Sequence, residues 1–245
     1  MKYINKKNTS FLTNKPFTIF EVKNFLSEDF YLKLYNSFPE QKYFGKSSHG
    51  NVIDTDNLYF KQHLQKFSVW VDFFKFLNSK KFINSAYTFA LIPNLKSRGL
   101  RALKKWTIRN LFFPLNKFYR SVKVETYFTI QRKNEHLRPH TDAPSKLLSM
   151  IFYFPDINSD VDNMGTEFWK VNKNKTLWKN WKNSHLPDDQ LKNFKNDNEL
   201  FFRSKFEKNK LVGFVKNDIS WHSVLNNSNA DNQIRKALVI NIREA

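Results

Sequence analysis

The chain has 245 residues and no cysteine, and its 41 lysines and arginines exceed its 22 aspartates and glutamates, for a net charge of +19. The missing cysteines exclude thiol catalysis, disulfides and cysteine-ligated zinc sites. A hydrophobic fraction of 40%, with 26 phenylalanines, excludes a disordered chain and predicts a packed core. The basic excess favours anionic partners.

No linker rich in proline, glycine or serine divides the chain, so we expect a single domain over residues 1–245. Within it, we expect residues 1–119 to form helices and loops that brace a core at 120–245, with an insertion near 170–208. No apolar run is long enough for a signal peptide or for a spanning helix of about 18 apolar residues. The expected compartment is therefore the cytoplasm.

The N-terminal third has the periodicity of helices. Ser27 can cap a helix that begins at Glu28, and further helices are expected over Gln62–Leu77 and Leu100–Leu111. The last of these carries a basic face that consists of Arg98, Arg101, Lys105 and Arg109. Either this face docks nucleic acid, anionic lipid or a phosphorylated glycan, or it is the solvated face of a basic protein.

Strand patterns surround a His-x-Asp motif in the middle of the chain. Lys123–Ile130 and Leu147–Phe154 are rich in β-branched, aromatic and aliphatic residues, which predicts two strands. His140 and Asp142 lie between them, at a strand end, where residues i and i+2 point to the same side. Both side chains are therefore expected to reach one metal ion. Pro139 argues against a helix through this segment, so His136 and His140 are not expected to form a helical zinc pair.

The last third of the chain contains a second histidine between predicted strands. Residues 219–224 and 234–242 have strand patterns; the first contains His222, and Arg235 and Lys236 stand at the entrance of the second. Two imidazoles and one carboxylate can occupy one face of an octahedral Fe(II) and leave the opposite positions open. A guanidinium near such a site can hold the remote carboxylate of a chelating dicarboxylate through a bidentate ion pair.

These motifs resemble the Fe(II)/2-oxoglutarate-dependent oxygenase superfamily, in its prolyl-hydroxylase-like branch, over about residues 120–243. The residues that carry the likeness are Glu135–Asp142, the strand to Tyr153, Met164–Phe168, Trp221–Val224 and the run that begins at Arg235. The resemblance implies a mostly β fold with flanking helices, in which a double-stranded β-helix (a jelly-roll or cupin-like core) has N-terminal helical support. It also implies that His140, Asp142 and His222 are catalytic residues that ligate Fe(II), and that Arg235 binds the 5-carboxylate of 2-oxoglutarate.

Simpler interpretations stay open for individual residues. Taken alone, His222 fits a hydrogen-bonded structural histidine, and Arg235 fits a solvated residue at a strand entrance. Lys236 is the alternative partner of the cosubstrate carboxylate, although strand parity places it on the opposite face from Arg235. Tyr127 and Gln131 share one face of their strand, and they either hydrogen-bond the cosubstrate or fill the barrel interior.

Three further histidines give weaker indications of a role. His49 fits a surface loop, His185 lies in the insertion and is expected to face solvent, and His136 has no spacing argument. One residue departs from the family pattern, since Asn134 stands in a turn where the family usually has glycine. Asparagine tolerates the same backbone region, so the departure is minor.

The resemblance implies a dioxygenase that uses Fe(II), 2-oxoglutarate and O2, with ascorbate as a supporting reductant. It would hydroxylate a substrate and release succinate and CO2. The substrate is unidentified: an anionic glycan or small molecule fits the charge, and an amino-acid or peptide substrate is an alternative. A nucleic-acid oxygenase ranks lower, because the dealkylating members have a second arginine six positions after the first, where this chain has Asn241. A catalytically silent barrel that binds a metal or a glycan is the alternative from another class, and the oligomeric state and any contact with an anionic surface stay open.

Overall fold

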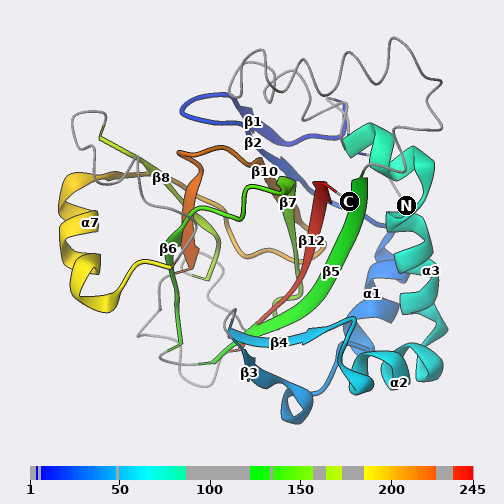
Figure 1. Ribbon diagram of the computed structural model, residues 1–245. Coiled ribbons are helices and arrows are strands. Elements are labelled where there is room, and N and C mark those ends of the chain that lie inside the picture. Colours follow the sequence, from blue (N-terminus) through cyan, green and yellow to red (C-terminus); the bar gives the residue numbers. More distant parts are fainter. Residues whose placement is uncertain are drawn as a thin grey trace.

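The computed structural model describes residues 4, 7–47, 50–86, 122–132, 135–156, 164–172, 185–224 and 234–244. Two antiparallel sheets dominate these residues (Figure 1). The larger sheet has eight strands in the spatial order β1 (Phe11–Thr13), β2 (Ile19–Val22), β10 (Leu211–Val215), β7 (Lys146–Tyr153), β12 (Arg235–Glu244), β5 (Val122–Gln131), β4 (Gly50–Asp54) and β3 (Gly45–Ser47). The smaller sheet has four, in the order β6 (Leu137–His140), β11 (Trp221–Val224), β8 (Glu167–Lys170) and β9 (Glu199–Arg203).

From β5 to β12 the chain winds back and forth between the two sheets. Strands β5, β7, β10 and β12 lie in the larger sheet, and β6, β8, β9 and β11 lie in the smaller one. This arrangement is a double-stranded β-helix, and the helices before it pack on its larger sheet. The predicted fold class, mostly β with flanking helices, is therefore confirmed.

The outer face of the larger sheet packs against helices α1 (Glu28–Asn36), α2 (Leu58–Lys66) and α3 (Ser68–Leu77) (Figure 1). Alternate residues of the strands point to this face, as the two-residue period of a strand requires. They include Phe20, Phe128, Met150, Phe152, Leu238 and Ile240. No helix among the described residues is long and apolar enough to cross a membrane.

Trp70 of α3 lies at the centre of this outer core. Its side chain is fully buried, its indole N–H donates a hydrogen bond to the carbonyl of Ser37 at 3.0 Å, and its ring meets Phe128 edge to face at 4.7 Å between centroids. Buried aromatic rings contribute large apolar areas, and edge-to-face pairs add about 1 kcal/mol. The helices therefore fix the position of β5, whose other face belongs to the barrel interior.

The opposite face of the larger sheet meets the smaller sheet in a second core. Phe168 of β8 and Phe214 of β10 face each other across it, with ring centroids 5.5 Å apart. His222 of β11 joins the same layer, because its ring lies 4.4 Å from that of Phe214. Polar side chains thus enter the space between the two sheets, and these side chains form the candidate site.

His63 of α2 is buried among the aromatic rings of the outer core. Burial lowers the pKa of His63 to about 4, whereas an unfolded histidine takes up a proton near pH 6.5. Protons therefore bind the unfolded chain first as the pH falls. We expect the free energy of unfolding to fall between pH 6.5 and pH 4, by up to about 1.4 kcal/mol per pH unit for this residue.

Urea denaturation of the wild type and of His63→Phe at pH 7 and pH 5 measures this effect. Other buried histidines contribute to both proteins, so the variant should show a smaller loss between the two pH values. Equal losses would show that His63 does not titrate as its burial implies.

Two helices stand where one was predicted over Gln62–Leu77. The break is at Phe67, whose φ of −127° and ψ of 89° are not helical. The apolar periodicity continues across the break because both helices pack on the same core. Helix α1 begins at Glu28 as predicted, although Ser27 makes no capping hydrogen bond with its side chain. The predicted basic helix at Leu100–Leu111 lies outside the described residues.

The predicted insertion near residues 170–208 contributes to the core. It contains β9, which pairs with β8 in the smaller sheet, and α7 (Leu191–Asp197). Phe194 of α7 packs on Trp221 from the outside of that sheet, with centroids 4.9 Å apart. The N-terminal third likewise contributes strands as well as the predicted helices and loops, because β1 to β4 extend the larger sheet on both sides.

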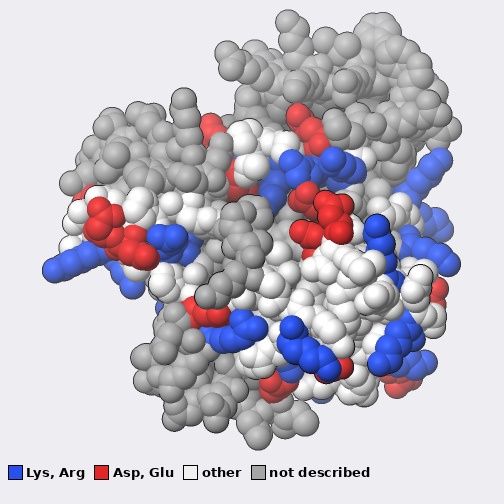
Figure 2. Space-filling model, turned by 60° about the horizontal axis from the view of Figure 1, so that its bottom comes forward, with Lys and Arg blue, Asp and Glu red and all other residues white. Residues whose placement is uncertain are grey.

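Charged side chains are mixed on the surface. On the face shown in Figure 2, the described lysines and arginines form several separate groups with acidic residues between or beside them. Exposed ion pairs of this kind contribute about 0–1 kcal/mol each. The large positive charge is therefore not gathered into one stripe on this face, among the described residues.

Candidate metal centre

Three predicted ligand residues come together between the sheets. His140 ends β6 and stands directly opposite His222 of β11 in the antiparallel register, while Asp142 follows two residues after β6. The ring centroids of the two histidines are 4.2 Å apart, and one possible ligand atom from each of the three residues lies within 4.8 Å of the other two. All three residues are buried.

Backbone carbonyls set the orientation of both imidazoles. The Nδ1 of His140 lies 2.9 Å from the carbonyl oxygen of Arg138, and the Nδ1 of His222 lies 3.1 Å from that of Ser220. A carbonyl can only accept, so each Nδ1 carries the proton and donates it. The lone pair of each ring is then on Nε2, which is the arrangement that metal-binding histidines have.

The electrostatic environment favours the ligand forms of all three side chains. Burial lowers the pKa of His140 and of His222, so both imidazoles are neutral. Burial alone would raise the pKa of Asp142, but the ammonium group of Lys146 lowers it, and the result is far below the usual range. Two neutral imidazoles and an ionised carboxylate can bind a metal ion without first losing protons.

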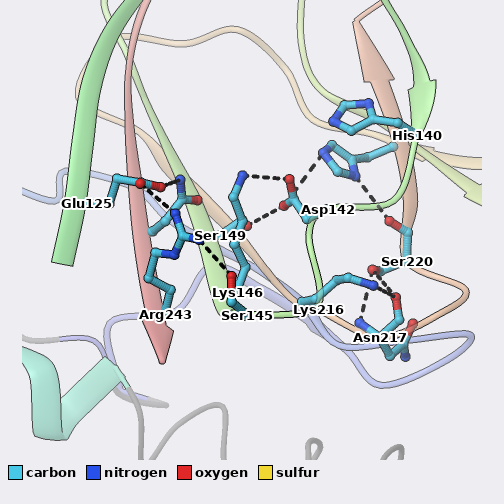
Figure 3. A network of polar contacts seen from close by, with 12 residues as sticks. Glu125, His140, Asp142, Ser145, Lys146, Ser149, Lys216, Asn217, Ser220 and Arg243 are labelled. Atoms are coloured by element: carbon cyan, nitrogen blue, oxygen red, sulfur yellow. Dashed lines mark hydrogen bonds and ion pairs between the residues drawn. The ribbon is translucent and has the colours of Figure 1, made fainter. Parts of the chain in front are cut away.

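Two residues of β7 hold the Asp142 carboxylate. The ammonium group of Lys146 lies 2.7 Å from Oδ1, and the hydroxyl of Ser149 donates a hydrogen bond to Oδ2 (Figure 3). Neither residue was predicted from the sequence. The available signal was Ser149, a single polar residue within an apolar strand that points to the same face as Ile151 and Tyr153.

Polar contacts continue outward from the site along β12. The guanidinium of Arg243 donates to the Glu125 carboxylate at 2.6 Å and to the Ser145 hydroxyl at 2.8 Å (Figure 3). Asn241, which is fully buried, donates to the other oxygen of Glu125 at 3.4 Å. This end of the barrel interior is therefore lined by charged and amide groups rather than by apolar ones.

Arg235 begins β12 at the opposite end of the interior. Its side chain is 5% exposed; Nε donates to the carbonyl of Met164 at 2.8 Å, and the guanidinium lies 5.4 Å from the ring centre of Tyr153. Among the described residues, no carboxylate pairs with it, and burial lowers its pKa. A buried charge without a counter-ion costs several kcal/mol, so this guanidinium is suited to an anionic ligand.

Lys236 has a different environment from Arg235. It lies on the outer side of the sheet, where its ammonium group pairs with Asp156 at 2.7 Å. The two residues point to opposite faces, as strand parity predicts.

Tyr127 and Gln131 of β5 point to the same interior as Arg235. In the register of the two strands Gln131 pairs with Arg235, and Tyr127 pairs with Val239, four residues further along. Gln131 donates a long hydrogen bond of 3.5 Å to the carbonyl of Val224. Burial raises the pKa of Tyr127, so its hydroxyl keeps its proton.

Tyr153 is a further interior residue that was not predicted as part of the site. It is fully buried, and its hydroxyl shares a hydrogen bond of 2.7 Å with the Thr166 hydroxyl. Its ring lies beside Arg235. The sequence did not indicate this role, because a tyrosine in an apolar strand is equally typical of the core.

His185 does not face solvent as expected. It is only partly exposed, and its ring lies 4.4 Å from that of His140. The backbone explains this position, since the N–H of Leu186 donates to the carbonyl of Pro139 at 3.0 Å and attaches the segment to β6. His136 lies near the surface with its Nε2 3.4 Å from Asp188, and His49 lies outside the described residues.

Gly165 lies at a close contact beside Arg235, between Met164 and Thr166. A Cβ at this position would stand 1.4 Å from the carbonyl oxygen of Ser204. The Gly165→Ala variant must therefore push the backbone at Ser204 away, although the N–H of that residue donates to the Thr166 carbonyl at 2.9 Å. We expect a loss of about 1–3 kcal/mol in the free energy of unfolding, measured by urea denaturation.

Gly45→Ala is the matched control, because a Cβ there meets nothing within 4 Å. If Gly165→Ala were no less stable than Gly45→Ala, the close approach of the two segments would be wrong.

The fold of the chain is similar to that of proteins of known structure. No family model and no curated protein matches the sequence. Among solved structures, a prolyl 4-hydroxylase from Phytophthora capsici is similar with a TM-score of 0.51 and 10% identity, over 93% of this chain and 59% of that one. AviO1 from Streptomyces viridochromogenes Tue57 is similar with a TM-score of 0.50 and 12% identity, over 92% of this chain and 89% of that one. The chain therefore shares its fold with these proteins.

Proposed function

We propose that the protein is an Fe(II)- and 2-oxoglutarate-dependent dioxygenase. The observation that carries the proposal is the group His140, Asp142 and His222, which offers three buried ligand atoms of the kind and number that non-haem Fe(II) enzymes use. The fold shared with a prolyl 4-hydroxylase supports it. Bound Fe(II) would supply the redox chemistry, in which O2 and 2-oxoglutarate give succinate and CO2 and a substrate C–H bond becomes an alcohol.

In this proposal the three ligand residues hold the metal on one side. The protonated Nδ1 atoms of His140 and His222 keep both Nε2 atoms directed at the ion. Asp142 supplies the negative charge, and the hydrogen bond that it accepts from the Ser149 hydroxyl fixes its orientation. Residues that orient ligands in this way contribute about 10–100-fold to metal affinity or activity.

Arg235 is proposed to bind the 5-carboxylate of 2-oxoglutarate. Its buried guanidinium has no carboxylate partner among the described residues, so the cosubstrate would supply the missing counter-charge. Lys236 is a poorer candidate, because it already pairs with Asp156 on the other side of the sheet. Tyr127 and Gln131 are proposed to hydrogen-bond the cosubstrate, since both point into the same interior.

We further propose that the substrate is a small anionic molecule. The net charge of +19 would attract it over a long range at low salt. Close to the site, Lys216 is buried near His222, and Arg243 contacts Ser145, which precedes Lys146 in the chain (Figure 3). An amino-acid or peptide substrate is the second candidate, and the likeness to a prolyl 4-hydroxylase favours it.

The experiment that tests the activity is succinate formation. Purified protein with Fe(II), ascorbate, O2 and 2-oxoglutarate should form succinate slowly even without a substrate. We expect succinate formation to require each of Fe(II), O2 and 2-oxoglutarate. No succinate would contradict the enzyme proposal and favour a silent metal- or glycan-binding barrel. Succinate formed without added iron in chelator-treated protein would contradict the dependence on Fe(II).

A screen for stimulation of this reaction tests the substrate class. Anionic metabolites and sugars, amino acids, peptides and oligonucleotides are added in separate pools. Stimulation by the anionic small molecules is the expected result. Stimulation by amino acids or peptides alone would favour the second candidate, and binding of oligonucleotides that weakens steeply with salt would point to nucleic acid.

A further inference from the structure

The two oxygens of the Asp142 carboxylate have different neighbours. Oδ1 faces the ammonium group of Lys146 at 2.7 Å, whereas Oδ2 is 4.0 Å from the Nε2 of His222. The Ser149 hydroxyl also donates to Oδ2. Oδ2 is thus directed toward His222, and Oδ1 is turned toward the positive charge of Lys146 (Figure 3).

Lys146 places a positive charge beside the carboxylate that is proposed to bind the metal. Its side chain is 15% exposed and that of Asp142 is 7% exposed, so water screens the pair only weakly. A cation on Oδ2 would share one carboxylate with this ammonium group, and like charges close together disfavour each other. Lys146 therefore competes electrostatically with any metal ion that Asp142 binds.

The same contact restricts how Asp142 can bind. Carboxylates ligate metal ions through one oxygen or through both. A second bond, from Oδ1, would bring the metal ion closer to the ammonium group that Oδ1 already faces, and the two positive charges would repel each other. One-oxygen ligation leaves more positions on the metal for other ligands.

We propose that Lys146 is a positioning residue that limits Asp142 to one-oxygen ligation and lowers the affinity of the site for divalent cations. One-oxygen ligation leaves open a coordination position of the metal, and 2-oxoglutarate needs that position to chelate the metal through two atoms. This inference rests on the proposed function, in which three protein ligands leave three positions free.

Two substitutions separate the charge of Lys146 from its contact. Lys146→Met removes both, so Asp142 is free to use both oxygens; Lys146→Gln removes the charge but keeps a donor for Oδ1. Lys236→Met is the matched control, because it removes a lysine–aspartate pair with the same 2.7 Å distance on the outer face of the sheet. Thermal denaturation of each variant shows whether it is folded.

The readouts are the affinity for Mn(II), by calorimetry, and the affinity of the Mn(II)-loaded protein for 2-oxoglutarate. We expect Lys146→Met to bind Mn(II) about 10-fold more tightly, since a neighbouring charge shifts the equilibria of an ionised group by about 1–3 powers of ten. The same variant should bind 2-oxoglutarate more weakly. Lys146→Gln should also bind Mn(II) more tightly but should keep wild-type affinity for 2-oxoglutarate, and Lys236→Met should match the wild type in both.

Weaker or unchanged Mn(II) binding in Lys146→Met would overturn the inference, because a residue that merely holds Asp142 in place would lower the metal affinity when removed. If Lys146→Met does not fold, unchanged Mn(II) binding in Lys146→Gln overturns it equally. Failure of the proposed function looks different: the wild type itself would then bind neither Mn(II) nor 2-oxoglutarate.

Discussion

Alanine at either ligand histidine is expected to remove metal binding and with it the formation of succinate. His140→Ala and His222→Ala each delete a buried Nε2 donor that no other described side chain replaces within the ligand group. Since the loss of a residue that only orients a ligand costs about 10–100-fold, the loss of a ligand should exceed about 100-fold in Mn(II) affinity. Calorimetry with Mn(II) and the rate of succinate formation measure the two effects.

His136→Ala is the control for this pair. His136 is a histidine of the same region whose Nε2 lies 3.4 Å from Asp188 near the surface, away from the three ligand residues. It should leave Mn(II) binding unchanged. If His140→Ala or His222→Ala retained wild-type Mn(II) affinity and turnover, the substituted histidine would be a structural residue, which is the simpler interpretation that the sequence leaves open for His222.

Removal of the Arg235 guanidinium is expected to have opposite effects on cosubstrate binding and on stability. Truncation of one partner of a buried charge pair costs about 2–5 kcal/mol of binding, so Arg235→Met should bind 2-oxoglutarate at least about 30-fold more weakly. In the ligand-free protein the same change removes a buried charge that has no counter-ion among the described residues. Its free energy of unfolding should therefore stay equal or rise, although the hydrogen bond to the Met164 carbonyl is lost.

Lys236→Met provides the comparison for Arg235→Met. It changes the neighbouring cation, which pairs with Asp156 on the opposite face, and it should leave 2-oxoglutarate binding unchanged. Calorimetry of the Mn(II)-loaded variants and urea denaturation of the metal-free ones distinguish the two residues. A loss of 2-oxoglutarate affinity in Lys236→Met, with none in Arg235→Met, would show that Lys236 binds the 5-carboxylate and that our assignment of Arg235 is wrong.

Strand parity explains why the ligand group could be predicted. His140 and Asp142 are two residues apart at a strand end, and a strand places such residues on one side. The pairing of His140 with His222 joins segments that are far apart in the chain, and no local pattern predicts it. The resemblance to a known family supplied that pairing, together with the assignment of Arg235.

The residues around the ligands could not be predicted in the same way. Lys146 reaches Asp142 only because the loop after β6 turns back into β7, and the sequence does not specify that turn. Tyr153 and Ser149 lie in an apolar strand that fits any buried sheet. A backbone hydrogen bond between Leu186 and Pro139 brings His185 close to His140. Such a bond does not depend on the side chains, so the sequence pattern does not predict it.

Local sequence patterns also failed to predict the break between two helices and one of the strands. The apolar residues of Gln62–Leu77 fit one continuous helix, yet the chain turns at Phe67, and both helices pack on the same core. Strand β9 was missed because its apolar run, Leu200–Phe202, is only three residues long and stands between two charged residues in a segment rich in lysine and asparagine. In both cases tertiary packing outweighed local preference.

The central claim is that the three ligand residues and Arg235 hold one metal ion and one molecule of 2-oxoglutarate together. Calorimetric titration of 2-oxoglutarate into metal-free and Mn(II)-loaded wild-type protein tests it most directly. We predict an affinity at least about 10-fold higher in the loaded protein, as expected for two ligands that bind each other within one site, and no such gain in His222→Ala. Equal affinity with and without Mn(II), or a gain that survives in His222→Ala, would contradict the claim.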